Sequence, residues 1–296
     1  MKTIKIARNS GFCFGVKRAI KIAQKAAKKF DKLVTLGPII HNPQMVEKLK
    51  KEGIDFVNNA AEIKDEATII RSHGVPKGVL ATLNLKAIPV INATCPYVSK
   101  TQNFGKKLSQ QNYTVFILGD KIHPEVIALK SYIEGETIIV SSPADIPDRN
   151  FQKIALISQT TKNIEDFKNI MTKLVNKTEE LRIINTICDA TTIRQKSTLK
   201  LARESDLMIV IGGKSSSNTK MLAKISKKFI ETHHIEIADE ISKKWFHNKN
   251  KIGLTAGAST PDWIIIKVYN KIVDHLGNHL DYIRKVEDIP GYKEEE

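Results

Sequence analysis

Short apolar runs alternate with amphipathic segments along most of this chain. Strand-like runs end in a glycine in three places, at 32–37, 114–119 and 206–212. Helix-like patterns follow polar turns, as at 45–49, 221–226 and 263–267. Charged residues interrupt the apolar positions of Met1–Arg8, so this segment is expected to be a first strand and not a signal peptide. Strands that alternate with helices predict an α/β fold built from small parallel sheets.

The same pattern occurs three times. The pairs Leu36-Gly37, Leu118-Gly119 and Ile211-Gly212 each begin 23 residues after a cysteine, from 13 to 36, from 95 to 118 and from 188 to 211. Five residues after the start of each pair come His41, His123 and Ser216. A second polar turn follows in every repeat, at His73, at Thr160 and at Ser259. Matched offsets of this kind indicate a threefold internal duplication.

The repeat suggests three small α/β domains and a tail. We expect the first domain to cover 1–94, with Cys13 and the N-terminal strand, the second 95–184 and the third 185–280, followed by a C-terminal tail at 281–296. In parallel α/β sheets, the loops after the carboxyl ends of the strands form the ligand site. A pseudo-threefold arrangement would bring three thiolates and six polar turns to one centre.

Composition places the chain among globular proteins. The sequence contains no apolar run of about 20 residues, the length that a membrane span needs. We therefore expect a cytoplasmic protein without a membrane partner, in a compartment where thiols stay reduced. The net charge of +15 comes from lysines spread over many segments, and no nucleic-acid motif accompanies it. We expect no nucleic-acid partner, although a basic surface could steer an acidic electron-transfer partner.

The three cysteines are candidate metal ligands. Each ends an extended run and opens a helix-like segment, where the helix N-terminus favours the thiolate. None lies in a C-x-x-C zinc pattern, and each alone would more often be a buried apolar residue. Three thiolates leave one position of a four-iron cluster open for substrate. Zinc with three sulfurs and a water is the competing metal, and the spacing does not decide between them.

The polar turns resemble an anion-binding site. Hydroxyls and main-chain N–H groups at helix starts bind phosphate, although a plain helix cap is the commonest use of a single serine or threonine there. Equivalent positions in a repeat favour a shared ligand. Histidines at these turns could donate to a phosphate or an alcohol. Glu125 lies in the first turn of an expected helix. Its carboxyl group could compensate the positive end of the helix dipole, donate a proton to the substrate, or do both.

These motifs together resemble the 4-hydroxy-3-methylbut-2-enyl diphosphate reductases, the IspH or LytB family. The matching segments reach all three repeats, and Val286–Gly291 in the tail also resembles the family. They are Gly11–Val16, Gly37–Asn42, Arg71–Val75, Ala93–Pro96, His123–Glu125, Gln159–Thr161, Cys188, Ser216–Asn218 and Thr255–Ser259.

The resemblance implies a trefoil of three pseudo-threefold-related α/β domains around a central 4Fe–4S cluster held by Cys13, Cys95 and Cys188. The implied reaction is reductive dehydroxylation of the hydroxylated C5 diphosphate to isopentenyl and dimethylallyl diphosphate, with electrons from a donor such as ferredoxin or flavodoxin. Glu125 would be the proton donor, with His123 and Thr160 near the substrate hydroxyl. The residues around the substrate would be His41, His73, His123, Thr160, Ser216, Ser217, Asn218 and Ser259.

Two other functions fit parts of the pattern. A non-redox dehydratase of the quinolinate-synthase kind would share the three cysteines and the open iron, but it would take up no electrons. The matches at Glu125 and Ser216–Asn218 argue against it. A cluster-based sensor that binds nucleic acid through the basic surface would show a salt-sensitive gel shift.

Overall fold

The computed structural model describes residues 2–64, 66–277 and 280–283. The described chain forms two compact units. Unit one comprises the described parts of Met1–Phe14, His41–Met45 and Asp189–Glu296, and unit two comprises those of Gly15–Ile40 and Val46–Cys188. None of the helices in these residues has the length and apolar content needed to cross a bilayer.

Unit two contains two parallel sheets, which we name after β2 and β6; we call the interior strand that follows the first helix of each repeat its central strand. The β2 sheet has the order β3-β2-β4-β5, and the β6 sheet has the order β7-β6-β8-β9. Their strands are β2 (Leu33–Leu36), β3 (Asp55–Val57), β4 (Ala67–Ile70), β5 (Val90–Asn92), β6 (Thr114–Leu118), β7 (Thr137–Val140), β8 (Phe151–Ser158) and β9 (Thr178–Ile183).

Unit one contains a third parallel sheet, the β10 sheet, with the order β11-β10-β12-β1-β13. Its strands are β1 (Lys2–Ile6), β10 (Leu207–Ile211), β11 (Thr232–Ile235), β12 (Lys251–Ala256) and β13 (Leu280–Ile283). Four of these strands repeat the order of the other two sheets, with β1 in the place of β5 and β9. The α/β class, with three parallel sheets of matching order, is therefore confirmed.

Two expectations about the ends of the chain are corrected. The N-terminal strand does not belong to the first predicted domain, because β1 pairs in parallel with β12, with Ile4 opposite Ile252. Residues Leu280–Ile283, expected mostly in a tail, form β13 beside β1. The rest of the predicted tail, 284–296, lies outside the described residues, as does the family-like segment Val286–Gly291.

The helices occupy equivalent places in the three repeats. Helices α1, α4 and α7 follow the cysteines, α2, α5 and α8 follow the central strands, and α3, α6 and α9 follow β4, β8 and β12. Their bounds are α1 (Phe14–Ala27), α2 (Pro43–Lys51), α3 (Lys77–Leu85), α4 (Pro96–Gln110), α5 (Pro124–Lys130), α6 (Ile164–Val175), α7 (Asp189–Glu204), α8 (Ser217–Lys227) and α9 (Asp262–Leu276). Short 3₁₀ helices span Ala60–Glu62, Pro143–Asp145, Ala238–Glu240 and Lys243–Phe246.

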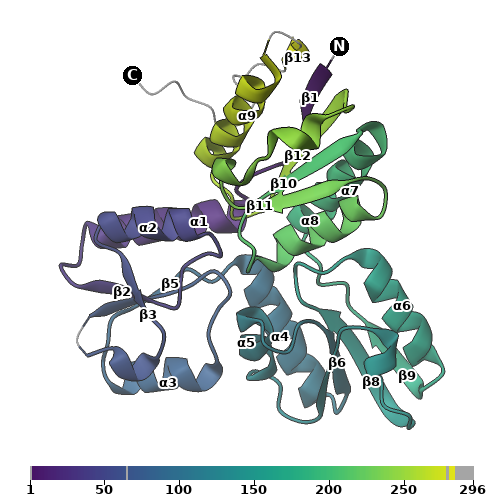
Figure 1. The fold of residues 1–296 in the computed structure, drawn as a ribbon. Helices are drawn as coiled ribbons and strands as arrows, with labels where there is room; N and C mark the ends of the chain where they lie inside the picture. The colour runs from purple at the N-terminus through teal and green to yellow at the C-terminus, as the bar shows by residue number, and fades with distance from the viewer. Residues whose placement is uncertain (1, 65, 278–279, 284–296) are drawn as a thin grey trace. The chain divides into compact units, whose positions relative to one another are not determined.

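Alternate residues of each central strand face opposite helix layers. In β6, Phe116 and Leu118 pack in the cluster that contains α6, while Val115 and Ile117 pack in the one that contains α4 and α5. Figure 1 shows α4 and α5 on one side of this sheet and α6 on the other. The β10 sheet is covered in the same way, by α9 on one face and by α7 and α8 on the other. Burial on both faces explains why these strands are continuous apolar runs.

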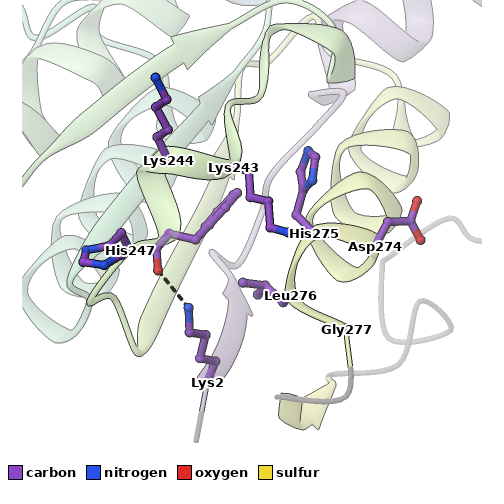
Figure 2. A pocket seen from close by; sticks show the side chains of 9 residues that line it. Lys2, Lys243, Lys244, His247, Asp274, His275, Leu276 and Gly277 are labelled. Atoms are coloured by element: carbon purple, nitrogen blue, oxygen red, sulfur yellow. Dashed lines mark hydrogen bonds between the residues drawn. The ribbon is translucent and has the colours of Figure 1, made fainter.

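One hollow in unit one lies away from the predicted site. It has a volume of about 1000 Å³ and is lined by Lys2, by residues just before β12 and by the end of α9. The ammonium group of Lys2 donates a hydrogen bond of 2.8 Å to the main-chain carbonyl of Phe246, which is the dashed line in Figure 2. These lining residues stand at the amino ends of β1 and β12. The predicted site residues of this unit follow the carboxyl ends, at the opposite edge of the same sheet.

Candidate functional site

Each cysteine stands at the start of a helix, as the sequence predicts. Cys95 is the N-cap residue of α4, while Cys13 and Cys188 directly precede α1 and α7. All three side chains are half-buried. The helix N-terminus places partial positive charge near each sulfur, which favours the thiolate over the thiol.

The main chain at each cysteine makes an equivalent hydrogen bond. The N–H of Cys13 donates to the carbonyl of Ala258 at 3.0 Å, in the turn after β12. The N–H of Cys95 donates to Ser72 at 2.9 Å after β4, and that of Cys188 donates to Thr160 at 3.1 Å after β8. Each cysteine therefore lies beside a polar turn at the carboxyl end of a sheet. The first of these contacts is in unit one, and the other two are in unit two.

Unit two brings Glu125, His123, Thr160 and His73 together. The carboxylate of Glu125 is buried, and it accepts hydrogen bonds from the N–H of Thr160 at 2.7 Å and from its hydroxyl at 2.9 Å. His123 caps α5, because its Nδ1 accepts from the N–H of Glu125 at 3.2 Å. In the neutral ring, this bond leaves the proton on Nε2, which becomes a donor. The ring of His73 meets that of His123 edge-on, with centroids 5.5 Å apart.

Gln159 fixes the turn that carries Thr160. Its main-chain N–H donates to the carbonyl of Leu118 at 2.8 Å, and its side-chain oxygen accepts from the N–H of Asp120 at 3.0 Å. These bonds join the carboxyl ends of β6 and β8. The sequence pattern marked Gln159 only as a motif neighbour of Thr160, since its bonding partners lie about 40 residues away.

Burial sets the protonation of Glu125. Loss of solvent raises the pKa of this carboxyl to about 7, although both hydrogen bonds from Thr160 act in the opposite direction. At neutral pH, Glu125 thus exists as a mixture of the acid and the carboxylate. A group that titrates near the working pH is well suited to general acid catalysis.

This pKa predicts a pH-dependent free energy of unfolding. Between pH 4.5 and about 7 the folded state holds the Glu125 proton and the unfolded state releases it, so stability falls as the pH rises. The difference in pKa corresponds to about 3 kcal/mol, reached above pH 7. Glu125→Gln should remove this fall. The free energy of unfolding of the wild type and of Glu125→Gln, measured by urea unfolding at pH 5 and pH 8, tests this prediction. An equal stability difference between the proteins at both pH values would contradict it.

In unit one, the start of α8 contains buried polar groups that have no protein partner. Ser216 caps the helix by accepting from the N–H of Thr219 at 3.3 Å, and Ser217 is half-buried. The side chain of Asn218 is 3% exposed, and neither its oxygen nor its nitrogen has a hydrogen-bond partner among the described residues. The same holds for the Thr219 hydroxyl. An unsatisfied buried amide costs about 1–3 kcal/mol, so this helix start has the character of a ligand site.

His41 and Ser259 are held together in the same unit. The hydroxyl of Ser259 donates to the main-chain carbonyl of His41 at 3.0 Å. The neighbouring Asn42 accepts from the N–H of Met45 at 2.8 Å and so caps α2. Unit one therefore joins the turn after β12 to the residue that precedes α2.

Two glycines let the loop between β10 and α8 approach His41 and the turn after β12. A Cβ on Gly213 would lie 2.6 Å from the His41 carbonyl oxygen. Gly212 has a φ of +141°, and a Cβ there would lie 2.5 Å from the Thr260 hydroxyl. Larger residues would push the loop with Ser216–Asn218 away from His41. The sequence repeat marked Gly212 as the end of a strand and did not reveal this close approach.

The chain matches known proteins over most of its length. The LytB protein family matches residues 4–273. A 4-hydroxy-3-methylbut-2-enyl diphosphate reductase from Campylobacter hominis is 47% identical over 91% of this chain and 98% of its own length. One of the same description from Aquifex aeolicus is 44% identical over 92% of this chain and 96% of its own.

Solved structures agree with this relationship. The reductase from Plasmodium falciparum superposes with a TM-score of 0.89 at 31% identity, covering 99% of this chain and 95% of that one. A structure of (E)-4-hydroxy-3-methyl-but-2-enyl diphosphate reductase, described as the terminal enzyme of the non-mevalonate pathway, has a TM-score of 0.67 at 44% identity. It covers 93% of this chain and all of that one. The chain therefore belongs to the LytB protein family.

Proposed function

We propose that this chain is a 4-hydroxy-3-methylbut-2-enyl diphosphate reductase, the terminal enzyme of the non-mevalonate route to isoprenoids. The observation that carries the proposal is the buried, unpartnered side chain of Asn218 at the start of α8. It supplies both a donor and an acceptor where main-chain N–H groups and serine hydroxyls already favour an anion. The oxygens of a diphosphate accept hydrogen bonds, so they satisfy the donors of this set, namely the amide NH2 of Asn218, the serine hydroxyls and the main-chain N–H groups.

The diphosphate would be bound by residues of several turns. Ser216, Ser217, Asn218 and Ser259 supply neutral donors, and His41 and His73 supply imidazole N–H groups. Hydroxyl, amide and imidazole donors would thus bind the diphosphate without a lysine side chain. Hydrogen bonds to a charged group are stronger than neutral ones, at about 1.5–3 kcal/mol each.

Proton delivery is assigned to Glu125, with His123 and Thr160 beside the substrate hydroxyl. In its acid form Glu125 can donate to the Thr160 hydroxyl, which is 2.9 Å away, and this leaves the threonine proton free to be passed on. The Nε2–H of His123 can donate to the same substrate oxygen. These groups would orient the hydroxyl and protonate it as the C–O bond breaks, so that it leaves as water.

The three cysteines fit a group that takes thiolate ligands. Three sulfurs at helix N-termini match the donor chemistry of an iron–sulfur cluster, and Cys13, Cys95 and Cys188 would hold it. When bound, a 4Fe–4S cluster with three cysteine ligands supplies electrons and one iron that is open to an oxygen ligand.

The reaction balances with two electrons and two protons. One proton leaves with the hydroxyl as water, and the second adds to the carbon skeleton at one of two positions. The two products are isopentenyl diphosphate and dimethylallyl diphosphate. We assign the supply of electrons to a protein such as ferredoxin or flavodoxin.

The activity can be tested directly. Anaerobically reconstituted protein is mixed with 4-hydroxy-3-methylbut-2-enyl diphosphate and reduced methyl viologen. Oxidation of the viologen together with both C5 diphosphates in the product mixture supports the proposal. No turnover from protein that contains the full complement of iron and sulfide would refute it.

Substrate binding is predicted to depend on Ser217 and Asn218. Ser217→Ala and Asn218→Ala should each raise KM by about 10- to 150-fold, because each removes about 1.5–3 kcal/mol of hydrogen bonding to the charged diphosphate. Steady-state kinetics measures this change. Ser215→Ala is the matched control in the same loop, since Ser215 is exposed and is expected to leave KM unchanged. Unaltered KM in both test variants would leave these residues with a helix-capping role alone.

A further inference from the structure

Arg194 holds the loop that leads to Cys13. Its Nη2 donates to the carbonyl of Gly11 at 2.8 Å, and its Nη1 donates to the carbonyl of Ala190, one turn back on α7, at 3.0 Å. The side chain is 3% exposed, although arginines are rarely so deeply buried. Gly11 lies two residues before Cys13, so the guanidinium is bonded to the segment that carries the thiol.

Arg18 makes a similar contact at Cys95. Its Nη1 donates to the carbonyl of Thr94 at 3.1 Å. Thr94 directly precedes Cys95, whose own N–H is bonded to Ser72. Both polar groups of the Thr94–Cys95 peptide unit are therefore hydrogen-bonded, the carbonyl to Arg18 and the N–H to Ser72.

The two arginines lie on corresponding helices of the repeat, Arg18 five residues after Cys13 and Arg194 six residues after Cys188. Arg18 lies on α1, the helix before β2, and Arg194 lies on α7, the helix before β10. The loops that they hold follow β5 and β1, which have the same position in their sheets. The first contact lies within unit two and the second within unit one. In each unit, therefore, a guanidinium bonds to the loop before a cysteine, at the carbonyl one residue before Cys95 and two residues before Cys13.

A guanidinium stays protonated even when it is buried. Burial of this charge is costly unless hydrogen bonds and opposite charge compensate it. Carbonyl bonds supply part of the compensation for Arg194, and the Cys13 thiolate on the same loop would supply negative charge. The positive charge in turn favours the thiolate and the more electron-rich state of whatever the thiolates bind.

We propose that Arg194 and Arg18 are positioning residues that hold the Cys13 and Cys95 thiolates in place for the cluster and supply positive charge beside it. This inference rests on the proposed function. Both residues lie outside the predicted site. Their replacement should change the stability and the midpoint potential of the cluster even when no substrate is present.

The test uses Arg194→Gln, Arg194→Lys and Arg18→Gln in anaerobically reconstituted protein. The matched control is Lys107→Gln, because Lys107 is an exposed cation in the last turn of α4, far along the helix from Cys95. Two quantities are measured without substrate, namely the rate of iron loss to a chelator and the midpoint potential. Arg194→Gln should lose iron about tenfold faster, as expected for one lost charge-assisted hydrogen bond, and should have a lower midpoint potential. Arg18→Gln should change both quantities in the same direction.

Arg194→Lys separates positioning from charge. Lysine keeps the charge but lacks the two-pronged donor, so its potential should stay near that of the wild type while its iron loss stays fast. Wild-type iron loss and potential in both glutamine variants would overturn the inference. If Arg194→Gln does not fold, Arg18→Gln and Arg194→Lys decide the question by the same two measurements. A wild-type protein that binds no cluster would instead refute the proposed function.

Discussion

Replacing Glu125 with glutamine is expected to lower kcat by about 100- to 10,000-fold, the usual contribution of a general acid. Glutamine has nearly the same shape and can still accept a hydrogen bond from Thr160, but it has no acidic proton to deliver. The cluster should be retained, because Glu125 is not among its proposed ligands. Steady-state turnover with reduced methyl viologen, alongside iron analysis, measures both effects.

Glu165→Gln is the matched control, since Glu165 is an exposed residue in the first turn of α6. Wild-type kcat should also fall as the pH rises above about 7, because the acid form of Glu125 is then lost. Glu125→Gln should lack this dependence. Unchanged turnover in Glu125→Gln would refute the role of Glu125 as proton donor.

Cys95→Ser should abolish both cluster binding and activity. A serine hydroxyl is a much poorer ligand for iron than a thiolate, and two remaining cysteines cannot hold the cluster firmly. The fold should persist, because the hydrogen bond from residue 95 to Ser72 uses the main chain. Iron and sulfide content, with far-UV circular dichroism as a check on folding, measures this.

Ser99→Ala, one turn further along α4, is the control for Cys95→Ser and should keep its iron. Full iron retention with normal activity in Cys95→Ser would remove Cys95 from the proposed ligands. The same test applies to Cys13 and Cys188, the two other cysteines of the chain.

Much of the fold could be predicted from the repeat. The cysteine-to-glycine spacing located the end of the central strand in all three sheets, because a fixed number of residues builds one helix and one strand. The place of β1 was missed, although the repeat contains the reason. The strand before Cys95, β5, pairs with β4 of the preceding repeat. The strand before Cys13, β1, has no preceding repeat to pair with. Only β12 of the last repeat can pair with β1 in that way.

Other features leave no periodic signal. Arg18 and Arg194 bond to main-chain carbonyls 76 and 183 residues away, and any residue type at the acceptor position supplies a carbonyl. The motif identified Asn218, but only the structure shows that its amide is buried without a protein partner. The raised pKa of Glu125 likewise depends on burial by distant segments and cannot be seen in the sequence around it.

An electron count tests directly whether this chain removes the substrate hydroxyl by reduction. Reduced methyl viologen is titrated into reconstituted protein with a known amount of substrate, and the C5 diphosphates are quantified. Two electrons should be consumed for each product molecule, and both isomers should form. Conversion of the substrate without consumption of viologen would contradict this prediction and would favour a non-redox dehydratase on the same three cysteines.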